Sequence, residues 1–205
     1  MKKTIAFLSL SLLLAACGVD TTGIASESAK PPRGNPAARV VITEYGDFEC
    51  PACRVAHTLI TQPLMQKYGS QVRLDFKQFP LLTLHPLAMS LAEASECAAD
   101  QGKFWEFVDT VYDRQLALDR EQKEMTAADI EPWAAGLGLD MELFGRCTSS
   151  HIKRQAIMAE FDAGRQAGIA GTPTFLVEGK KVNNDLAELS AAVEEALKNA
   201  APRAL

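Results

Sequence analysis

The chain has 205 residues, of which 47% are hydrophobic and 23% charged, and its formal net charge at pH 7 is -5. This composition is ordinary for a soluble globular protein, and the length suits one domain with a sizeable core or one domain carrying an insertion. Because no part of the sequence carries a basic stripe, the composition argues against a nucleic-acid-binding protein.

The first sixteen residues have the pattern of an export signal. Lys2 and Lys3 precede an apolar run of about ten residues, 5–14, which is too short to span a membrane as a helix. The run ends in Leu14-Ala15-Ala16-Cys17, which resembles a bacterial lipobox, where the cysteine is acylated and begins the mature chain. An ordinary signal with an incidental Cys17 is the alternative. We expect a signal peptide over 1–16 and an extracytoplasmic protein lipid-anchored to the cell envelope membrane through Cys17.

The remaining chain divides into a tether, a domain and a tail. Residues 17–38 consist mainly of Gly, Ser, Thr, Pro and charged residues, which predicts a flexible tether behind the lipidated cysteine. A single domain is expected over 39–199, followed by a frayed tail at 200–205.

The predicted elements of the domain open with a strand over 39–45, a helix over 50–68 and a strand over 72–79, whose order favours a parallel pair with a right-handed crossover. Residues 86–167 contain no strand-like run. Helices are expected over 86–100, 103–118, from 126, over 141–147 and over 151–167. A strand over 171–177, a turn, a short strand from 181 and a helix over 186–198 follow. We interpret 86–150 as a helical insertion.

Two cysteines stand at the start of the first predicted helix, in Cys50-Pro51-Ala52-Cys53. Backbone N–H groups at a helix start are unpaired and the helix dipole is positive there, so a thiolate is stabilised. Pro51 suits this first turn because it has no N–H to lose. A structural zinc half-site or two incidental cysteines are the alternatives.

The order of elements, with two motifs, resembles that of the DsbA-like thiol:disulfide oxidoreductases over about residues 39–199. The motifs are Cys50-Pro51-Ala52-Cys53 and Gly171-Thr172-Pro173-Thr174-Phe175, and Gln101-Gly102-Lys103-Phe104-Trp105 also resembles a segment of that family's helical domain. The resemblance implies an α/β, thioredoxin-like fold with a helical insertion between its βαβ and ββα halves. It also implies that the redox-active disulfide is the reactive group, with no other cofactor and no metal.

The resemblance assigns roles to the motif residues. Cys50 would be the exposed sulfur attacked by a client thiolate, and Cys53 the more buried resolving cysteine. Pro173 matches the family's cis-proline and Thr172 a main-chain contact to the client, beside Pro51 and Ala52. A tight trans turn before an edge strand is the alternative for Pro173.

Glu44 stands six residues before Cys50, where the family carries a buried acid that can shuttle a proton. An exposed edge glutamate is the alternative, and Lys77 is a weak candidate for its partner. Asp47 and Glu49 are expected to be solvated turn residues. Ala52 departs from the best-known family pattern, which has histidine there, so we predict a Cys50 pKa below that of free cysteine but less depressed than in His-bearing relatives.

Cys97 and Cys147 remain as one possible pair, fifty residues apart on two helices of the insertion. In an exported protein a structural disulfide is expected, whereas two reduced, buried thiols are the alternative. A four-cysteine zinc site with Cys50 and Cys53 is conceivable on ligand type alone. The three histidines are too widely spaced to suggest a ligand set: His57 is expected to be exposed on a helix, His85 at a helix start and His151 at the surface.

These features predict an enzyme that introduces disulfides into exported proteins. Its partners would be thiol-containing clients and a membrane redox protein that re-oxidises it, and the protein is expected to be a monomer that binds no nucleic acid. A disulfide reductase or isomerase is one alternative, and a non-catalytic, thiol-based metal-delivery lipoprotein is another.

Overall fold

The computed structural model describes residues 19–200. The expected signal peptide, the lipidation site Cys17 and most of the tail lie outside the described residues. Within residues 19–200, no helix has the length and apolar character needed to cross a membrane.

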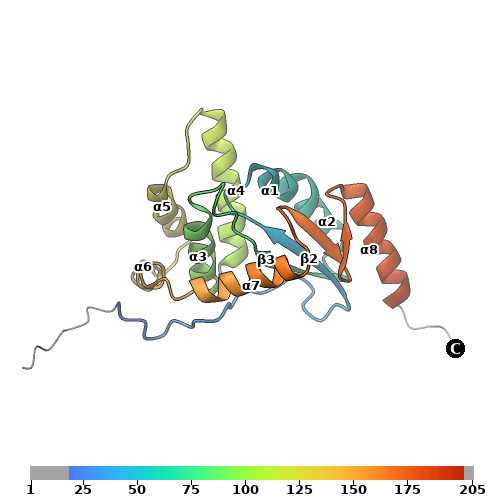
Figure 1. The fold of residues 1–205 in the computed structure, drawn as a ribbon, viewed down its shortest axis with the longest axis horizontal. Helices are drawn as coiled ribbons and strands as arrows, with labels where there is room; N and C mark the ends of the chain where they lie inside the picture. The colour runs from blue at the N-terminus through green and yellow to red at the C-terminus, as the bar shows by residue number, and fades with distance from the viewer. Residues whose placement is uncertain (1–18, 201–205) are drawn as a thin grey trace, which may run out of the picture.

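A five-stranded mixed sheet forms the centre of the fold (Figure 1). β2 and β3 pair in parallel, and every other neighbouring pair is antiparallel, in the order β1-β3-β2-β4-β5. This arrangement confirms the α/β, thioredoxin-like fold. The strands are β1 Arg33–Gly34, β2 Val40–Gly46, β3 Val72–Gln78, β4 Thr174–Val177 and β5 Lys180–Val182.

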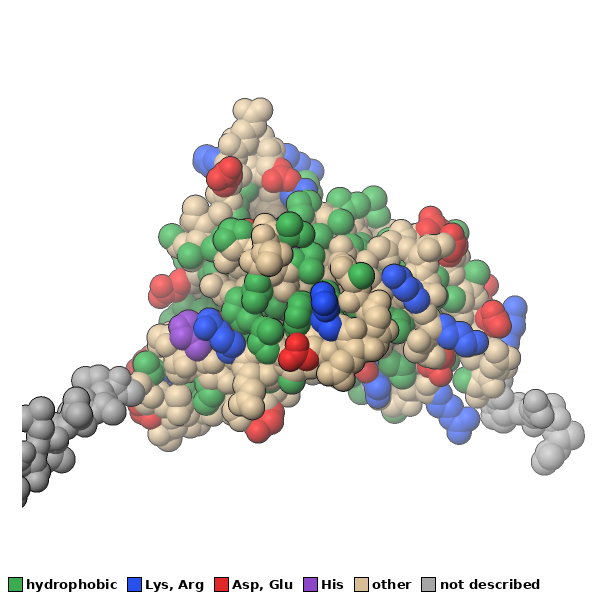
Figure 2. Space-filling model, in the orientation of Figure 1, with side chains coloured by type: hydrophobic (Ala, Val, Ile, Leu, Met, Phe, Trp, Pro, Cys, Tyr) green, Lys and Arg blue, Asp and Glu red, His purple; other side chains and the backbone are tan. Residues whose placement is uncertain are grey.

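A helical half lies beside the sheet, between β3 and β4 in the chain (Figure 1). It corresponds to the insertion expected over 86–150. On the face drawn in Figure 2, hydrophobic side chains gather over this half, and acidic and basic side chains are scattered around them. Its helices are α3 Ala88–Ala99, α4 Phe104–Arg120, α5 Ile130–Ala135 and α6 Met141–Ser150, and α7 Arg154–Gln166 returns the chain to the sheet.

Helices cover both faces of the sheet. α1 Pro51–Ala56, α2 Gln62–Tyr68 and α8 Leu186–Ala200 share one hydrophobic core with Val40 and Ile42 of β2. Since side chains alternate along a strand, Glu44 lies on the same face as these two residues. α7 packs on the other face, where a Cβ added at Gly164 would lie 2.8 Å from the Tyr45 ring.

The helix that begins at the CxxC motif is not a continuous α-helix. A π-helical segment, His57–Thr61, separates α1 from α2. Pro63, in the first turn of α2, has no N–H and its ring crowds the carbonyl four residues earlier, which accounts for the irregularity. The wider turn places both His57 and Thr61 in the interior.

The tether expectation is wrong for the residues just before the domain. Arg33–Gly34 forms the edge strand β1, and Trp105 Nε1 donates a hydrogen bond to Pro31 O at 2.9 Å. Lys30 Nζ lies 2.8 Å from carboxylate oxygens of both Glu96 and Glu160. The tether was predicted because the segment contains few apolar residues. The contacts that hold it are mainly polar, so that composition did not indicate them.

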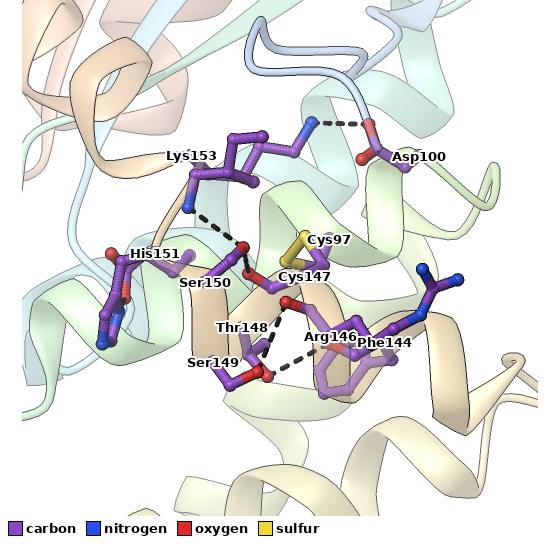
Figure 3. The surroundings of a disulfide bond; sticks show 12 residues. Cys97, Asp100, Phe144, Arg146, Cys147, Thr148, Ser149, Ser150, His151 and Lys153 are labelled. Carbon is purple, nitrogen blue, oxygen red and sulfur yellow. Dashed lines mark hydrogen bonds and ion pairs between the residues drawn. A yellow bond between two sulfur atoms is a disulfide. The ribbon is translucent and has the colours of Figure 1, made fainter. Parts of the chain in front are cut away.

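Cys97 of α3 and Cys147 of α6 form a disulfide, with their Cα atoms 5.8 Å apart (Figure 3). The expected pairing is therefore present, and it rules out the four-cysteine zinc arrangement. Nearby, the buried Lys153 Nζ lies 2.6 Å from Asp100 Oδ1, beyond the last residue of α3. The disulfide thus fixes α6 against α3 inside the helical half.

Candidate active site

Cys50 is the N-cap residue of α1 and Pro51 occupies the first turn. The backbone N–H groups of Cys53 and Arg54 donate to Cys50 O at 3.1 and 3.2 Å, so the helix closes directly on the cysteine. Cys50 Sγ lies 3.6 Å from Thr172 O. Cys50 is less exposed than expected, since only 6% of its surface is accessible, and Cys53 is fully buried.

The two thiols of the motif have opposite pKa shifts. A hydrogen bond from the Cys53 thiol is the main cause that lowers the pKa of Cys50 to about 5. Burial opposes this shift, whereas the Thr172 side-chain hydroxyl and the backbone N–H groups of Cys53 and Ala52 add to it. Burial, with the neighbouring Cys50, raises the pKa of Cys53 well above its ordinary value. The predicted depression of the Cys50 pKa is therefore found, and Cys53 holds the proton of the reduced pair.

The segment facing the cysteines comes from the start of β4. The Thr172–Pro173 peptide bond is cis, as the family resemblance implies. Thr174 Oγ1 donates to Gly171 O at 2.8 Å, and Asn184 Nδ2 donates to Pro173 O at 2.7 Å. These hydrogen bonds hold the Thr172 carbonyl against Cys50.

Glu44 is buried in β2, on the face of the sheet covered by α1 and α2. Thr61 Oγ1 donates a hydrogen bond to Glu44 Oε2 at 3.0 Å. Burial raises the pKa of Glu44 above its ordinary value, although nearby His57 opposes the shift. The expected burial is found, but Lys77 is not the partner, because its Nζ pairs with Glu160 at 3.0 Å.

Asp47 and His57 are buried, contrary to expectation. Asp47 Oδ2 accepts a hydrogen bond from Leu81 N at 2.8 Å and lies 2.8 Å from His85 Nδ1. His57 Nε2 lies 2.8 Å from Asp109 Oδ1. Long-range partners on other elements bury these two side chains, which residue type and local pattern do not reveal.

The three remaining predictions, for one turn glutamate and two histidines, have different outcomes. Glu49 is half-buried, and its carboxylate accepts a hydrogen bond from Leu87 N, so it is not a freely solvated turn residue. His85 precedes α3 in a turn, with its side chain 18% exposed. His151 is exposed at the C-terminal end of α6, as expected.

α4 supports the loop before the cysteines through two side chains that the sequence did not single out. Gln115 Nε2 donates a short hydrogen bond to Phe48 O, and Tyr112 Oη donates to Asp47 O at 3.4 Å. Phe48 also stacks on Phe76 of β3, with ring centroids 5.2 Å apart. The loop is therefore fixed from both the helical half and the sheet.

The site as a whole can perform thiol–disulfide exchange. Cys50 is ionised at neutral pH and Cys53 is protonated, so Cys50 is both a good nucleophile and a good leaving group. Within residues 19–200, no three His, Cys, Asp or Glu side chains cluster as metal ligands would. Six of the predicted site residues lie together around the start of α1 and the start of β4, namely Cys50, Pro51, Ala52, Cys53, Thr172 and Pro173. Glu44 lies in the same half of the fold.

Comparison with known proteins identifies the class. A sequence model of the family described as thioredoxin matches residues 26–195. The chain therefore belongs to the thioredoxin family. Solved structures that share its fold, one of them a thioredoxin-like oxidoreductase, are described next.

Solved structures share this fold over most of their length. A thioredoxin-like oxidoreductase from Silicibacter pomeroyi is 27% identical, has a TM-score of 0.69, and aligns over 84% of this chain and 94% of that one. Oxidised BdbD from Bacillus subtilis is 22% identical, with a TM-score of 0.69 over 83% and 94% of the two chains. The thiol-disulfide exchange protein alpha-DsbA2 from Wolbachia pipientis is 20% identical, with a TM-score of 0.66 over 82% and 87%.

Curated relatives with similar sequences are much longer proteins. The Na(+)/H(+) antiporter NhaA 3 of Salinispora tropica is 37% identical over 170 residues, which are 82% of this chain and 25% of the antiporter. The antiporter NhaA 1 of Salinispora arenicola is 36% identical over 80% of this chain and 24% of its own length. The chain thus spans about a quarter of these relatives, and the likeness concerns that quarter.

Proposed function

We propose that this protein is an extracytoplasmic oxidase that introduces disulfides into exported proteins. The observation that carries the proposal is the low pKa of Cys50 beside the raised pKa of Cys53. A stable Cys50 thiolate stabilises the reduced enzyme, so electrons pass readily from a client dithiol to the enzyme disulfide.

The reaction proceeds in two exchanges. A client thiolate attacks Cys50 Sγ, the Cys50–Cys53 bond breaks, and Cys53 leaves with the bonding electron pair and takes up a proton. A second client thiolate then attacks the client sulfur of the mixed disulfide and expels the Cys50 thiolate. The client has lost two electrons and the enzyme has gained them, so a membrane redox partner must restore the disulfide.

Glu44 is the proposed donor of the proton to Cys53. Its buried carboxyl has a raised pKa and therefore holds a proton more readily than an exposed glutamate. Glu44→Gln should slow release of Cys53 by on the order of 10²-fold. Stopped-flow mixing of the oxidised enzyme with a small thiol measures this rate, and a wild-type rate in the variant would reject the role.

Clients would bind along an apolar groove beside the cysteines. The groove has a volume of about 600 Å³. Val55 and Leu59, which are 50% and 61% exposed, lie in it and offer apolar contact to an unfolded chain. Thr172 would add the main-chain contact. The lining includes Pro51, Ala52, Val55, Leu59, Pro173 and Leu186.

The proposed location rests on the export signal and on Cys17. Acylation with two or more chains would hold the protein at the envelope membrane. Labelling cells with a radioactive fatty acid tests the anchor. Label in the wild-type protein and none in Cys17→Ser would support it, and an unlabelled wild type would reject it.

The direction of the reaction is tested with two assays on the same preparation. An oxidase refolds a reduced, cysteine-bearing client in the presence of an oxidant, and Cys50→Ser abolishes this activity. The reduction potential of the Cys50–Cys53 pair should lie well above the roughly -270 mV typical of reducing thioredoxins. A potential near that value, with strong insulin reduction and no client oxidation, would instead identify a reductase.

A further inference from the structure

We propose that His85 is a positioning residue that places a positive charge beside Cys50 and thereby stabilises its thiolate. The proposal rests on disulfide exchange at Cys50 and Cys53 and holds for either direction of the reaction. Ala52 stands where the best-known pattern of the resembled family has histidine, and its side chain has neither a charge nor a hydrogen-bond donor. His85 reaches the site instead from the loop between β3 and α3.

Asp47 connects His85 to the cysteine pair. Its Oδ2 lies 2.8 Å from His85 Nδ1, and its side chain is fully buried. The Cys50 N–H donates to Asp47 O at 3.2 Å, and the Asp47 N–H points to Cys53 Sγ at 3.5 Å. His85 is therefore held by a residue whose backbone contacts both cysteines.

Two carboxyl groups lie on the loop before Cys50, so a nearby cation would favour the Cys50 thiolate. A buried Asp47 carboxylate next to the helix start would oppose ionisation of Cys50, and Glu49 adds a second carboxyl on the same loop. Arg54, one turn into α1, is paired with Asp119. Asp119, Lys123 and Glu124 line a groove with Glu49 and Arg54. Protonated His85 neutralises Asp47 from the loop side.

The titration of His85 agrees with this geometry. Burial lowers its pKa, but the hydrogen bond and charge of Asp47, together with Cys50 and Glu49, outweigh burial and raise the pKa above its ordinary value. The charge of Cys50 is thus one of the causes that favour protonated His85, and we expect protonated His85 to favour the Cys50 thiolate in return. Because coupling between two sites is reciprocal, the pKa of each residue should change with the charge of the other.

Substitutions separate this charge from a purely structural hydrogen bond. His85→Asn keeps a donor near the position of Nδ1 without the charge, His85→Ala removes both, and His85→Lys restores a cation. We expect the thiolate absorbance of Cys50 to titrate about one pH unit higher in the Asn and Ala variants, roughly a tenfold weaker ionisation. His85→Lys should recover part of this loss.

Two outcomes of that titration would overturn the proposal. One is a wild-type Cys50 pKa in all three variants. The other is a wild-type pKa in His85→Asn with a raised pKa only in His85→Ala, because this would show that the hydrogen bond alone matters. In either case, loss of client oxidation in Cys50→Ser would still support disulfide exchange at this site.

A measurement on the wild-type protein covers the case in which a variant does not fold. The pKa of His85, followed by NMR of its ring protons, should be higher in the reduced enzyme, which carries the Cys50 thiolate, than in the oxidised enzyme. Equal His85 pKa values in the two redox states would reject the coupling. The ring-proton signals of His151, exposed at the end of α6, serve as the control that should not respond to the redox state.

Discussion

At the scale of single residues, the two cysteines differ because one helical turn separates two environments. Cys50 meets the helix N-terminus, the Cys53 thiol and Thr172, whereas Cys53 lies in the core with little to stabilise a charge. The chemistry of the site follows from this asymmetry, since one sulfur leaves as a thiolate and the other as a thiol.

The pH dependence of the reduction potential should show this asymmetry. Above the Cys50 pKa of about 5, reduction takes up one proton, on Cys53, so the potential should fall by about 30 mV per pH unit. Below pH 5 both sulfurs are protonated and the slope should approach about 59 mV per unit. Equilibration with glutathione between pH 4 and 8 measures the slope. A slope near 59 mV per unit at pH 7 would contradict the low pKa.

Ala52 gives a second prediction at this scale. Ala52→His should lower the Cys50 pKa further, by about one unit, because a donor or positive charge would then face the sulfur. The thiolate absorbance reports the change, and Ala52→Asn serves as the uncharged control. An unchanged or higher pKa in Ala52→His would disprove the prediction.

At the scale of elements, the packing of α7 on the sheet depends on a missing side chain. Gly164 has no Cβ, and an added one would lie 2.8 Å from the Tyr45 ring and 3.0 Å from the Phe79 ring. Gly145, in α6, has nothing within 4 Å of the same position. Both glycines lie inside helices, but only Gly164 is needed for close packing.

Alanine substitution should separate these two glycines. Gly164→Ala should lower the free energy of unfolding by about 1–3 kcal/mol, because the aromatic rings must move. Gly145→Ala should raise it by about 0.5–1 kcal/mol through its better helix propensity. Urea denaturation of both variants measures the changes. Equal effects would show that α7 does not approach the sheet as closely as described.

The disulfide between α3 and α6 gives the second element-scale prediction. Replacing both Cys97 and Cys147 by alanine should cost about 3–4 kcal/mol, since the bond closes a fifty-residue loop. Denaturant unfolding measures this loss, and the Cys50 pKa serves as the control because it should not change. A variant as stable as the wild type would show that the bond adds nothing to stability.

At the scale of the whole molecule, residues 30–33 connect the sheet to the helical half. Lys30 lies between Glu96 of α3 and Glu160 of α7, with its side chain only 8% exposed. Arg33, in β1, lies over Trp105 of α4 at 4.9 Å. The N-terminal segment therefore connects the sheet, the insertion and the returning helix.

Removing Lys30 should destabilise the fold as a unit. Lys30→Ala leaves the buried Glu96 carboxylate without its cation and should cost about 3 kcal/mol. Lys67→Ala is the matched control, because Lys67 pairs with Glu194 at 3.2 Å in an exposed pair, and its loss should leave stability nearly unchanged. Thermal unfolding measures both. Similar small losses in the two variants would show that the Lys30 contacts are as weak as surface pairs.

The sequence by itself determined the features whose cause is local. Strand alternation, helix punctuation and the position of Pro51 and Cys50 at a helix start depend on neighbouring residues, so the thioredoxin-like fold, the insertion and the lowered Cys50 pKa were predictable. Only the tertiary structure decided the state of side chains whose partners lie far along the chain. Asp47 is buried by His85, His57 meets Asp109, and Lys30 meets Glu96 and Glu160. The local sequence predicts that a charged or histidine side chain is exposed to water. Such a side chain is buried only when an element far along the chain supplies its partner.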